Sequence, residues 1–118
     1  GVSPDEIGSL SAHGTATAYN DEMESIAFDR AKLNHVPLNS MKGYFGHTLG
    51  AAGLFESAIA MQGLRKQKIV ASAGFEELGV SKNINPIRES KEHSHKIALK
   101  TASGFGGCNA SAIFKLDE

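Results

Sequence analysis

The 118-residue sequence is poor in several features that mark particular protein classes. It has a single cysteine, Cys108, which excludes an intramolecular disulfide and leaves too few thiolates for a zinc finger. No apolar run approaches the roughly 18 to 20 residues that a bilayer-spanning helix needs, so we expect no membrane segment. Lys and Arg total 12 against 13 Asp and Glu, which provides no electrostatic basis for binding nucleic acid or an anionic membrane. These absences favour a cytoplasmic protein.

Glycine, in contrast, is frequent and clustered. The chain has 13 glycines, and several lie close together, at positions 46, 50 and 53 and at positions 104, 106 and 107. Because glycine has no Cβ atom, such clusters indicate backbone that another group approaches closely. The first cluster lacks the G-x-G-x-x-G spacing of a dinucleotide-binding loop, so we expect no nucleotide cofactor.

The residue patterns predict one domain over residues 1–118, with strands at both ends of the chain. Short apolar segments at 7–12 and 38–41 are candidate strands, and residues 97–101 and 110–116 alternate between apolar and polar. The glycine-rich segment 104–107 between the last two predicts a hairpin. Residues 66–95 are polar and interrupted by glycine and proline, and we interpret them as a long connection.

Two helices are predicted between these strands. The first spans about 21–32, where Asp21 and Glu24 have the spacing of a capping box. The second spans about 47–65, and its apolar residues surround the helical wheel, which is typical of a helix buried on all sides. Strands that alternate with helices and end in a hairpin favour an α/β layered sheet.

Two histidines and a lysine lie where catalytic groups are often found. His13 follows a predicted strand in the segment HGTAT, where the hydroxyls of Thr15 and Thr17 point the same way if the segment is extended. Lys42 is expected to end a strand and His47 to open the buried helix, so both would face one edge of the sheet. A structural explanation stays open, with His13 bonded to a carbonyl and Lys42 at the surface.

The lysine requires a counter-charge if its ammonium lies near an apolar helix. Asp21 and Glu24, at the start of the first helix, are the candidate partners of Lys42. Glu56 lies inside the second helix, where a carboxylate is rarely unpaired, and we expect it to accept a structural hydrogen bond.

Three other reactive side chains are assigned no catalytic role. His93 and His95 provide only two ligands in a charged segment, so no metal site is expected. Cys108 has no nearby basic residue or activating histidine in the sequence, which favours packing over nucleophilic catalysis.

Three segments carry a family resemblance. AHGTAT, SMKGYFGHTLGAAG and SGFGGCNASAIF occur in this order and closely resemble the C-terminal half of the β-ketoacyl synthases, the condensing enzymes of fatty acid and polyketide assembly. The resemblance implies a thiolase-like layered α/β fold, of which residues 1–118 are the C-terminal domain, with a mixed sheet and a buried central helix. It also implies that the N-terminal half, which bears the nucleophilic cysteine, is absent, because Cys108 stands where the family usually has threonine or serine.

The resemblance implies a role for each candidate residue. His13 and His47 match the two catalytic histidines of the family. Lys42 matches the lysine that orders the site through acidic residues, here Asp21 and Glu24.

The same resemblance implies contacts for the substrate. Thr15 and Thr17 match positions that hold the pantetheine arm of an acyl carrier protein, and Phe105 matches a gating phenylalanine. Glu56, with its structural hydrogen bond, is expected to be a supporting residue of the site and not a substrate contact.

Two imidazole donors suit the implied chemistry, because a malonyl thioester that loses carbon dioxide develops negative charge on its thioester oxygen. For His47 to donate from one nitrogen while it stays neutral, we expect its other nitrogen to accept a bond from a backbone N–H near the helix start.

The implied activity is decarboxylative condensation of malonyl-acyl carrier protein with an acyl-enzyme thioester, for which this chain alone is expected to be inactive. The substrate is carried on phosphopantetheine, and no other cofactor is expected. The expected partners are acyl carrier protein, the cysteine-bearing half and a second subunit in a homodimer or heterodimer. Two alternatives stay open: a non-catalytic subunit similar to the chain-length factors, and a carrier-protein-binding module.

Overall fold

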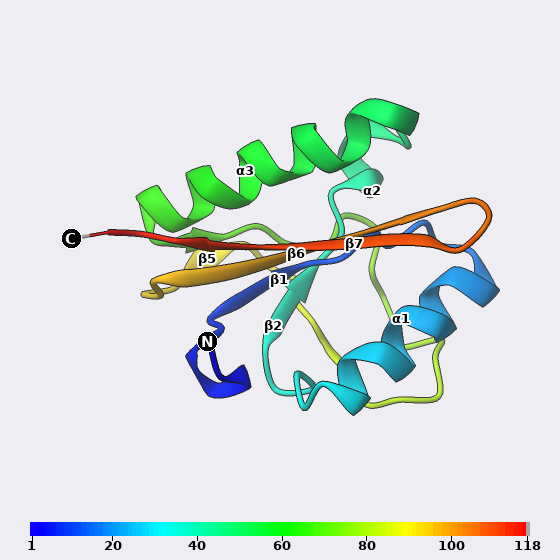
Figure 1. Cartoon of the computed structure of the whole chain (residues 1–118), viewed down its shortest axis with the longest axis horizontal. Helices are drawn as coiled ribbons and strands as arrows, with labels where there is room; N and C mark the ends of the chain where they lie inside the picture. The colour runs from blue at the N-terminus through cyan, green and yellow to red at the C-terminus, as the bar shows by residue number, and fades with distance from the viewer. Residues whose placement is uncertain (118) are drawn as a thin grey trace.

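The computed structural model describes residues 1–117, which form a five-stranded mixed sheet with helices on both faces (Figure 1). The strand order is β4-β2-β1-β6-β7, and every neighbouring pair is parallel except β6 and β7. The strands are β1 (Ser9–Ser11), β2 (Pro37–Asn39), β4 (Asn85–Pro86), β6 (Ile97–Gly104) and β7 (Cys108–Lys115). The α/β class and the terminal hairpin are therefore confirmed.

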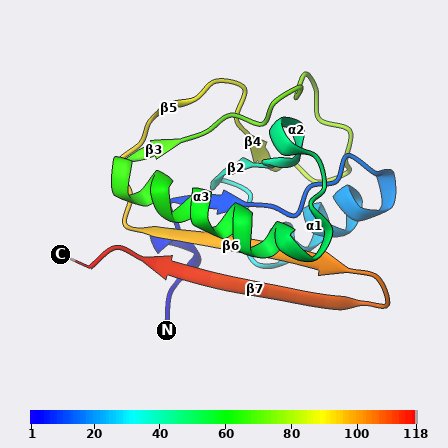
Figure 2. The same cartoon turned by 90° about the horizontal axis from the view of Figure 1, so that it is seen from above.

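The two long helices lie on opposite faces of the sheet. The helix α1 (Ala18–Arg30) packs below it and α3 (Ala52–Lys66) runs across the top, as Figures 1 and 2 show. The short helix α2 (Lys42–Phe45) and a 3-10 turn (Leu49–Ala51) precede α3. Another 3-10 turn (Pro4–Glu6) precedes β1. The N-terminal ends of α1 and α3 lie at the same end of the sheet as the β6–β7 turn, so loops from distant parts of the sequence meet there (Figure 1).

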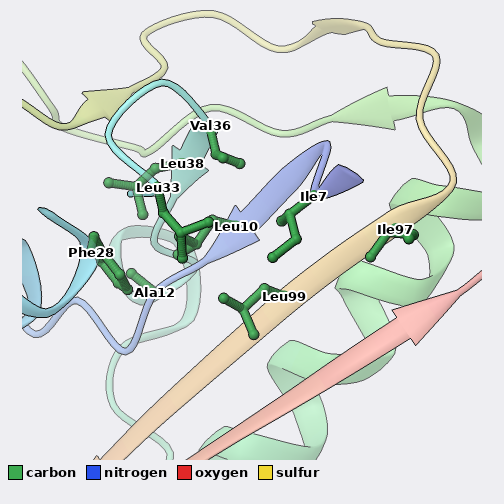
Figure 3. Close-up of a cluster of buried hydrophobic side chains, with 9 residues drawn as sticks. All are labelled: Ile7, Leu10, Ala12, Phe28, Leu33, Val36, Leu38, Ile97 and Leu99. Atoms are coloured by element: carbon green, nitrogen blue, oxygen red, sulfur yellow. The ribbon is translucent and has the colours of Figure 1, made fainter. Parts of the chain in front are cut away.

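The main apolar core lies between the sheet and α1 (Figure 3). Alternation along β1 and β6 places Leu10 and Leu99 in this core and directs Ser11 and Lys100 to the opposite face, which α3 covers. The cluster consists of Ile7, Leu10, Ala12, Phe28, Leu33, Val36, Leu38, Ile97 and Leu99. The face toward α3 is more polar, and it carries the groups of the site described below.

The start of the first helix differs from the prediction. The helix begins at Ala18, with Thr17 as its N-cap in an extended conformation, so Asp21 and Glu24 lie inside the helix and form no capping box. The carboxylate of Glu24 instead accepts bonds from the backbone N–H groups of His13 and Gly14. Glu24 therefore contacts residues that are distant from it in the sequence, although its local spacing predicted a role at the start of the helix.

The second helix is also shorter and more exposed than predicted. It begins at Ala52, and only Ala52, Glu56 and Leu64 of its residues are buried. Leu54 is 79% exposed and Phe55 41%, because the sheet covers only one side of α3. The expectation of a helix buried on all sides is therefore wrong for this chain, and its outer face is apolar and open.

The segment 66–95 is more ordered than a simple connection. It contributes β4 to the main sheet, and β3 (Lys68–Ile69) pairs with β5 (Lys91–Glu92) in a separate antiparallel ribbon. His95 is buried and its Nδ1 lies 2.7 Å from the carbonyl oxygen of His93. The His93 Nε2 lies 2.8 Å from the carbonyl oxygen of Gly8. Both rings thus bind backbone carbonyls.

No helix within residues 1–117 is long and apolar enough to cross a bilayer.

Candidate active site

The loop that carries His13 leaves β1 and is held by a buried carboxylate. Glu24 of α1 accepts the backbone N–H groups of His13 at 2.9 Å and Gly14 at 2.7 Å, together with the hydroxyl of Thr101 at 2.8 Å. Gly14 adopts φ +48°, and an added Cβ would lie 2.6 Å from the Cβ of Ser40. Ser40 donates its hydroxyl to the Gly14 carbonyl at 2.6 Å. The backbone of the histidine loop is therefore tied to both α1 and the end of β2.

Lys42 fixes the orientation of the His13 ring. Its ammonium nitrogen lies 2.6 Å from the His13 carbonyl oxygen and 3.3 Å from His13 Nδ1. A lysine ammonium has only donors, so His13 Nδ1 is the acceptor and the ring proton stays on Nε2. Burial, reinforced by the charge of Lys42, lowers the pKa of His13 below its ordinary value. His13 is thus a neutral imidazole that presents an Nε2–H group.

His47 is in a turn between α2 and the 3-10 turn before α3, rather than at the first position of a helix. Gly46 directs the chain into this turn with φ 72° and ψ −172°, a conformation that glycine adopts readily. The Nδ1 atom of His47 accepts the backbone N–H of Leu49 at 3.0 Å. The expected bond from a backbone N–H near the helix start is therefore confirmed, and the neutral ring carries its proton on Nε2.

The two imidazoles lie side by side although they are 34 residues apart in the sequence. Their ring centroids are 5.1 Å apart and the rings are nearly perpendicular, with an interplanar angle of 80°. Because both Nδ1 atoms are occupied as acceptors, both Nε2–H groups are available to an incoming acceptor. The structure thus places His13, Lys42 and His47 at one end of the sheet, and the predicted convergence is confirmed.

The counter-charge of Lys42 is not the one predicted. Its ammonium lies 2.7 Å from Oε1 of Glu56 in α3, with side-chain exposures of only 6% and 4%. Asp21 forms a contact with Asn20, and Glu24 binds the histidine loop, so neither is the ion-pair partner of Lys42. Lys42 also begins a short helix and does not end a strand. That helix and α3 both start near this end of the sheet, which brings the pair together.

Sequence reasoning missed Lys100. This side chain lies on β6, is 3% exposed, and places its ammonium 2.6 Å from Oε2 of Glu56. Glu56 therefore lies between two buried lysines. Burial alone would raise the pKa of Glu56, but the bonds from Lys100 and Lys42 hold it below its ordinary value. Local spacing gave no signal for this burial, because the alternation of residues 97–101 normally assigns the polar residue to solvent.

The remaining predicted residues lie in the loop after His13 and in the β6–β7 turn. The hydroxyls of Thr15 and Thr17 lie 2.7 Å apart and bind each other, although the segment is not extended, because Ala16 between them adopts φ +58°. Both line a cavity of about 530 Å³, to which Gly14 and Lys42 also contribute. Phe105 is fully exposed in the β6–β7 turn.

Cys108 begins β7 and is exposed, so the expectation that it is a packing residue is wrong for this chain.

Known proteins resemble this chain in both sequence and fold. Residues 1–76 match the family described as "Beta-ketoacyl synthase, C-terminal domain". The chain is 36% identical to 3-oxoacyl-[acyl-carrier-protein] synthase 2 of Vibrio cholerae, over 98% of this chain and 29% of that protein. It is therefore similar to less than a third of the length of that relative.

Two solved structures resemble the chain. One is a β-ketoacyl synthase from Burkholderia phymatum, with a TM-score of 0.94 and 28% identity over 99% of this chain and 29% of that one. The other is a ketosynthase bound to a hexaketide in complex with its type II polyketide acyl-carrier protein, with a TM-score of 0.90 and 30% identity over 97% and 29%. The fold of this chain thus matches part of each.

Proposed function

Because this chain belongs to the β-ketoacyl synthase C-terminal domain family, we propose that it supplies the two histidines of a condensing enzyme of fatty acid or polyketide synthesis. The complete enzyme joins malonyl-acyl carrier protein to an acyl group held on a cysteine as a thioester. The family resemblance places that cysteine in the N-terminal half, and this chain spans only 29% of the length of its Vibrio cholerae relative. The proposed class is acyltransferase.

The reaction proceeds in two steps at the proposed site. The bond between the malonyl methylene carbon and its carboxylate breaks, carbon dioxide leaves, and the electron pair forms an enolate whose charge is on the thioester oxygen. The enolate carbon then attacks the acyl thioester carbonyl, and the cysteine leaves as a thiolate. The charge that develops in the first step is what His13 and His47 stabilise.

The observation that carries the proposal is the pair of neutral imidazoles whose Nδ1 atoms are both occupied. Lys42 and the Leu49 N–H fix the two tautomers, so the Nε2–H groups of rings 5.1 Å apart can donate to one oxygen. Donors that are already oriented require no reorganisation as the charge forms, and removal of one such donor costs about 2.7 to 4 kcal/mol.

The surroundings support a substrate delivered on a long arm. Thr15 and Thr17 line the cavity of about 530 Å³ beside the histidine loop, and their hydroxyls suit the amides of a pantetheine arm. Phe105, at the tip of an exposed turn, is the proposed gate. The carrier protein is thus the proposed partner in substrate delivery. The compartment that we propose for this reaction is the cytoplasm.

The outer face of α3 supports association with the cysteine-bearing half. Leu54 is 79% exposed and Met61 40%, an unfavourable arrangement unless another part of the enzyme covers them. Residues 1–118 are therefore proposed to function as the C-terminal domain of a larger enzyme that forms a homodimer or heterodimer, and to be inactive without the other half.

The test separates the two half-reactions in the complete synthase. His13→Ala and His47→Ala should each slow carbon dioxide release from malonyl-acyl carrier protein by about 10²- to 10³-fold. Acylation of the distant cysteine should remain measurable in both variants. His35→Ala, at an exposed histidine, is the matched control. Carbon dioxide release at the normal rate in either site variant contradicts the proposal.

The retained histidines also favour a catalytic subunit over a non-catalytic subunit similar to the chain-length factors. The same carbon dioxide assay distinguishes these two kinds of subunit.

A further inference from the structure

A second buried lysine lies behind the histidine pair. Lys100 is in the middle of β6 with a side chain 3% exposed, and burial lowers its pKa below the ordinary value despite the adjacent Glu56 carboxylate. Lysine is almost never fully buried unless its ammonium is paired. The sheet face that α3 covers therefore contains a charged group that ordinary packing does not require.

The ammonium of Lys100 is surrounded by four oxygen atoms. It lies 2.9 Å from the carbonyl oxygen of Ala12, 3.3 Å from that of Ser11 and 2.7 Å from that of Thr101. The fourth is Oε2 of Glu56 at 2.6 Å. Because an ammonium has three protons, all of its donors are used within this cage. The side chain thus connects β1, β6 and α3 at one point.

Two of these contacts lead directly to the proposed catalytic histidine. The Ser11 and Ala12 carbonyls belong to the last residues before His13, so Lys100 holds the backbone from which that side chain extends. The Glu56 carboxylate connects the two lysines, with Lys100 on Oε2 and Lys42 on Oε1. Lys42 in turn contacts His13 Nδ1. Lys100 therefore acts on both the backbone and the ring of His13.

Glu56 lies between two ammonium groups, whereas burial of one carboxylate requires only one. The other buried carboxylate of this region, Glu24, binds the backbone of the histidine loop and the hydroxyl of Thr101. A second lysine on Glu56 is therefore not needed to neutralise that carboxylate, which indicates a role in the site beyond stabilisation of the fold.

We propose that Lys100 is a positioning residue of the condensation site: its ammonium fixes Glu56 and the end of β1, so that Lys42 remains on His13 Nδ1 and leaves the Nε2–H group free for the substrate. This inference rests on the proposed function. Lys100 does not touch the substrate, and it acts through Glu56, Lys42 and the backbone before His13.

The test uses Lys100→Met in the complete synthase, because methionine has a similar length and no charge. We expect kcat for carbon dioxide release from malonyl-acyl carrier protein to fall by up to about 10²-fold, the effect of a small misplacement of a reacting group, with a smaller change in KM. Lys68→Met, at an exposed lysine of β3, is the matched control and should change neither parameter.

The pH profile distinguishes positioning from a structural role. His13 is faced by Lys42 of α2, Glu24 of α1, His47 of the turn before α3 and Lys100 of β6; the positive groups lower its pKa and Glu24 raises it. Removal of the Lys100 charge should therefore raise the pKa of His13. Protonated His13 can no longer accept a hydrogen bond from Lys42, so the decarboxylation rate falls as His13 becomes protonated. With a higher pKa of His13, this fall on the acidic side of the pH profile should occur at higher pH.

Chemical rescue provides a second readout. In Lys100→Ala, the cage of carbonyl and carboxylate oxygens keeps its negative potential, and added ammonium or methylammonium should restore part of the lost rate. A variant with wild-type kcat and pH profile overturns the proposal. A slow variant with an unshifted pH profile and no rescue by added amine also overturns the proposal. If Lys100→Met, Lys100→Gln and Lys100→Ala all fail to fold, Lys100 is a structural residue and the proposal is wrong.

The outcome also separates this inference from the proposed function. If the wild-type synthase releases carbon dioxide and His13→Ala does not, normal behaviour of Lys100→Met refutes only the role of Lys100. If His13→Ala is as fast as the wild type, the proposed function itself is wrong.

Discussion

The carboxylate of Glu56 is the side chain whose replacement should destabilise this fold most sharply. Its two oxygens lie 2.7 Å from the Lys42 ammonium and 2.6 Å from that of Lys100. Glu56→Gln retains the size and shape of the side chain but removes its charge. Two ammonium groups then remain in the interior without the carboxylate that contacts both of them, and the new amide N–H group faces one of them.

The expected cost follows from the burial of all three groups. The side chains of Lys42, Glu56 and Lys100 are 6%, 4% and 3% exposed, so water cannot replace the lost carboxylate without rearrangement. Removal of one member of a buried ion pair typically costs about 3 to 5 kcal/mol. Because the whole free energy of unfolding of a domain is about 5 to 15 kcal/mol, this loss is a large fraction of it.

Chemical denaturation of the wild type and Glu56→Gln measures this cost as a change in the free energy of unfolding. Glu77→Gln, at an exposed glutamate, is the matched control and should change it by less than about 0.5 kcal/mol. The double variant Glu56→Gln/Lys100→Met should recover about 0.5 to 3 kcal/mol relative to Glu56→Gln, since it contains one unpaired ammonium instead of two. A single variant no less stable than Glu77→Gln would refute the ion-pair reasoning.

Two other perturbations test the packing and the loop. Burial lowers the pKa of His95, so the unfolded chain binds a proton before the folded one, and stability should fall as the pH drops from 6.5 through the folded pKa. His95→Gln should reduce the difference in unfolding free energy between pH 7.5 and 5.5. His35→Gln, at an exposed histidine, should leave this difference unchanged. If both variants change it equally, burial of His95 is not the cause. Gly14→Ala should cost at least about 1 to 3 kcal/mol and abolish carbon dioxide release, because φ is +48° and the new Cβ would meet Ser40 at 2.6 Å. Gly50→Ala, where an added Cβ meets no atom within 4 Å, is its control, and similar stabilities of the two variants contradict the steric argument.

Local patterns predicted the parts of the fold that depend on neighbours in sequence. Alternation around the glycine-rich turn identified the β6–β7 hairpin, and the position of His13 after a short apolar strand placed it at the end of the sheet. The family resemblance then paired it with His47. The expected acceptor role of one His47 nitrogen followed from the requirement for a neutral donor.

The long-range ion pairs could not be predicted in this way. The pairing of Lys42 with Glu56 depends on how α2 meets α3, whereas sequence spacing favoured Asp21 and Glu24. Lys100 alternates with Ile97 and Leu99, a pattern that normally assigns the polar residue to solvent. Only the position of α3 over that face makes it buried.

The apolar outer face of α3 shows the limit of a burial prediction made from hydrophobicity. A helix that is apolar on all sides indicates a buried environment, but the pattern does not say which atoms cover it. The sheet covers one side, and Leu54 on the other side is 79% exposed in this chain.

The protonation of the two histidines is the central physical claim, and NMR of the complete synthase with ¹⁵N-labelled histidine tests it directly. Two-bond ¹⁵N–¹H correlations of the imidazole rings distinguish the Nε2–H tautomer, the Nδ1–H tautomer and the imidazolium ion. We predict that at pH 7.5 His13 and His47, assigned by comparison with the single-alanine variants, are both neutral with the proton on Nε2. An Nδ1–H tautomer or an imidazolium at either position contradicts the account.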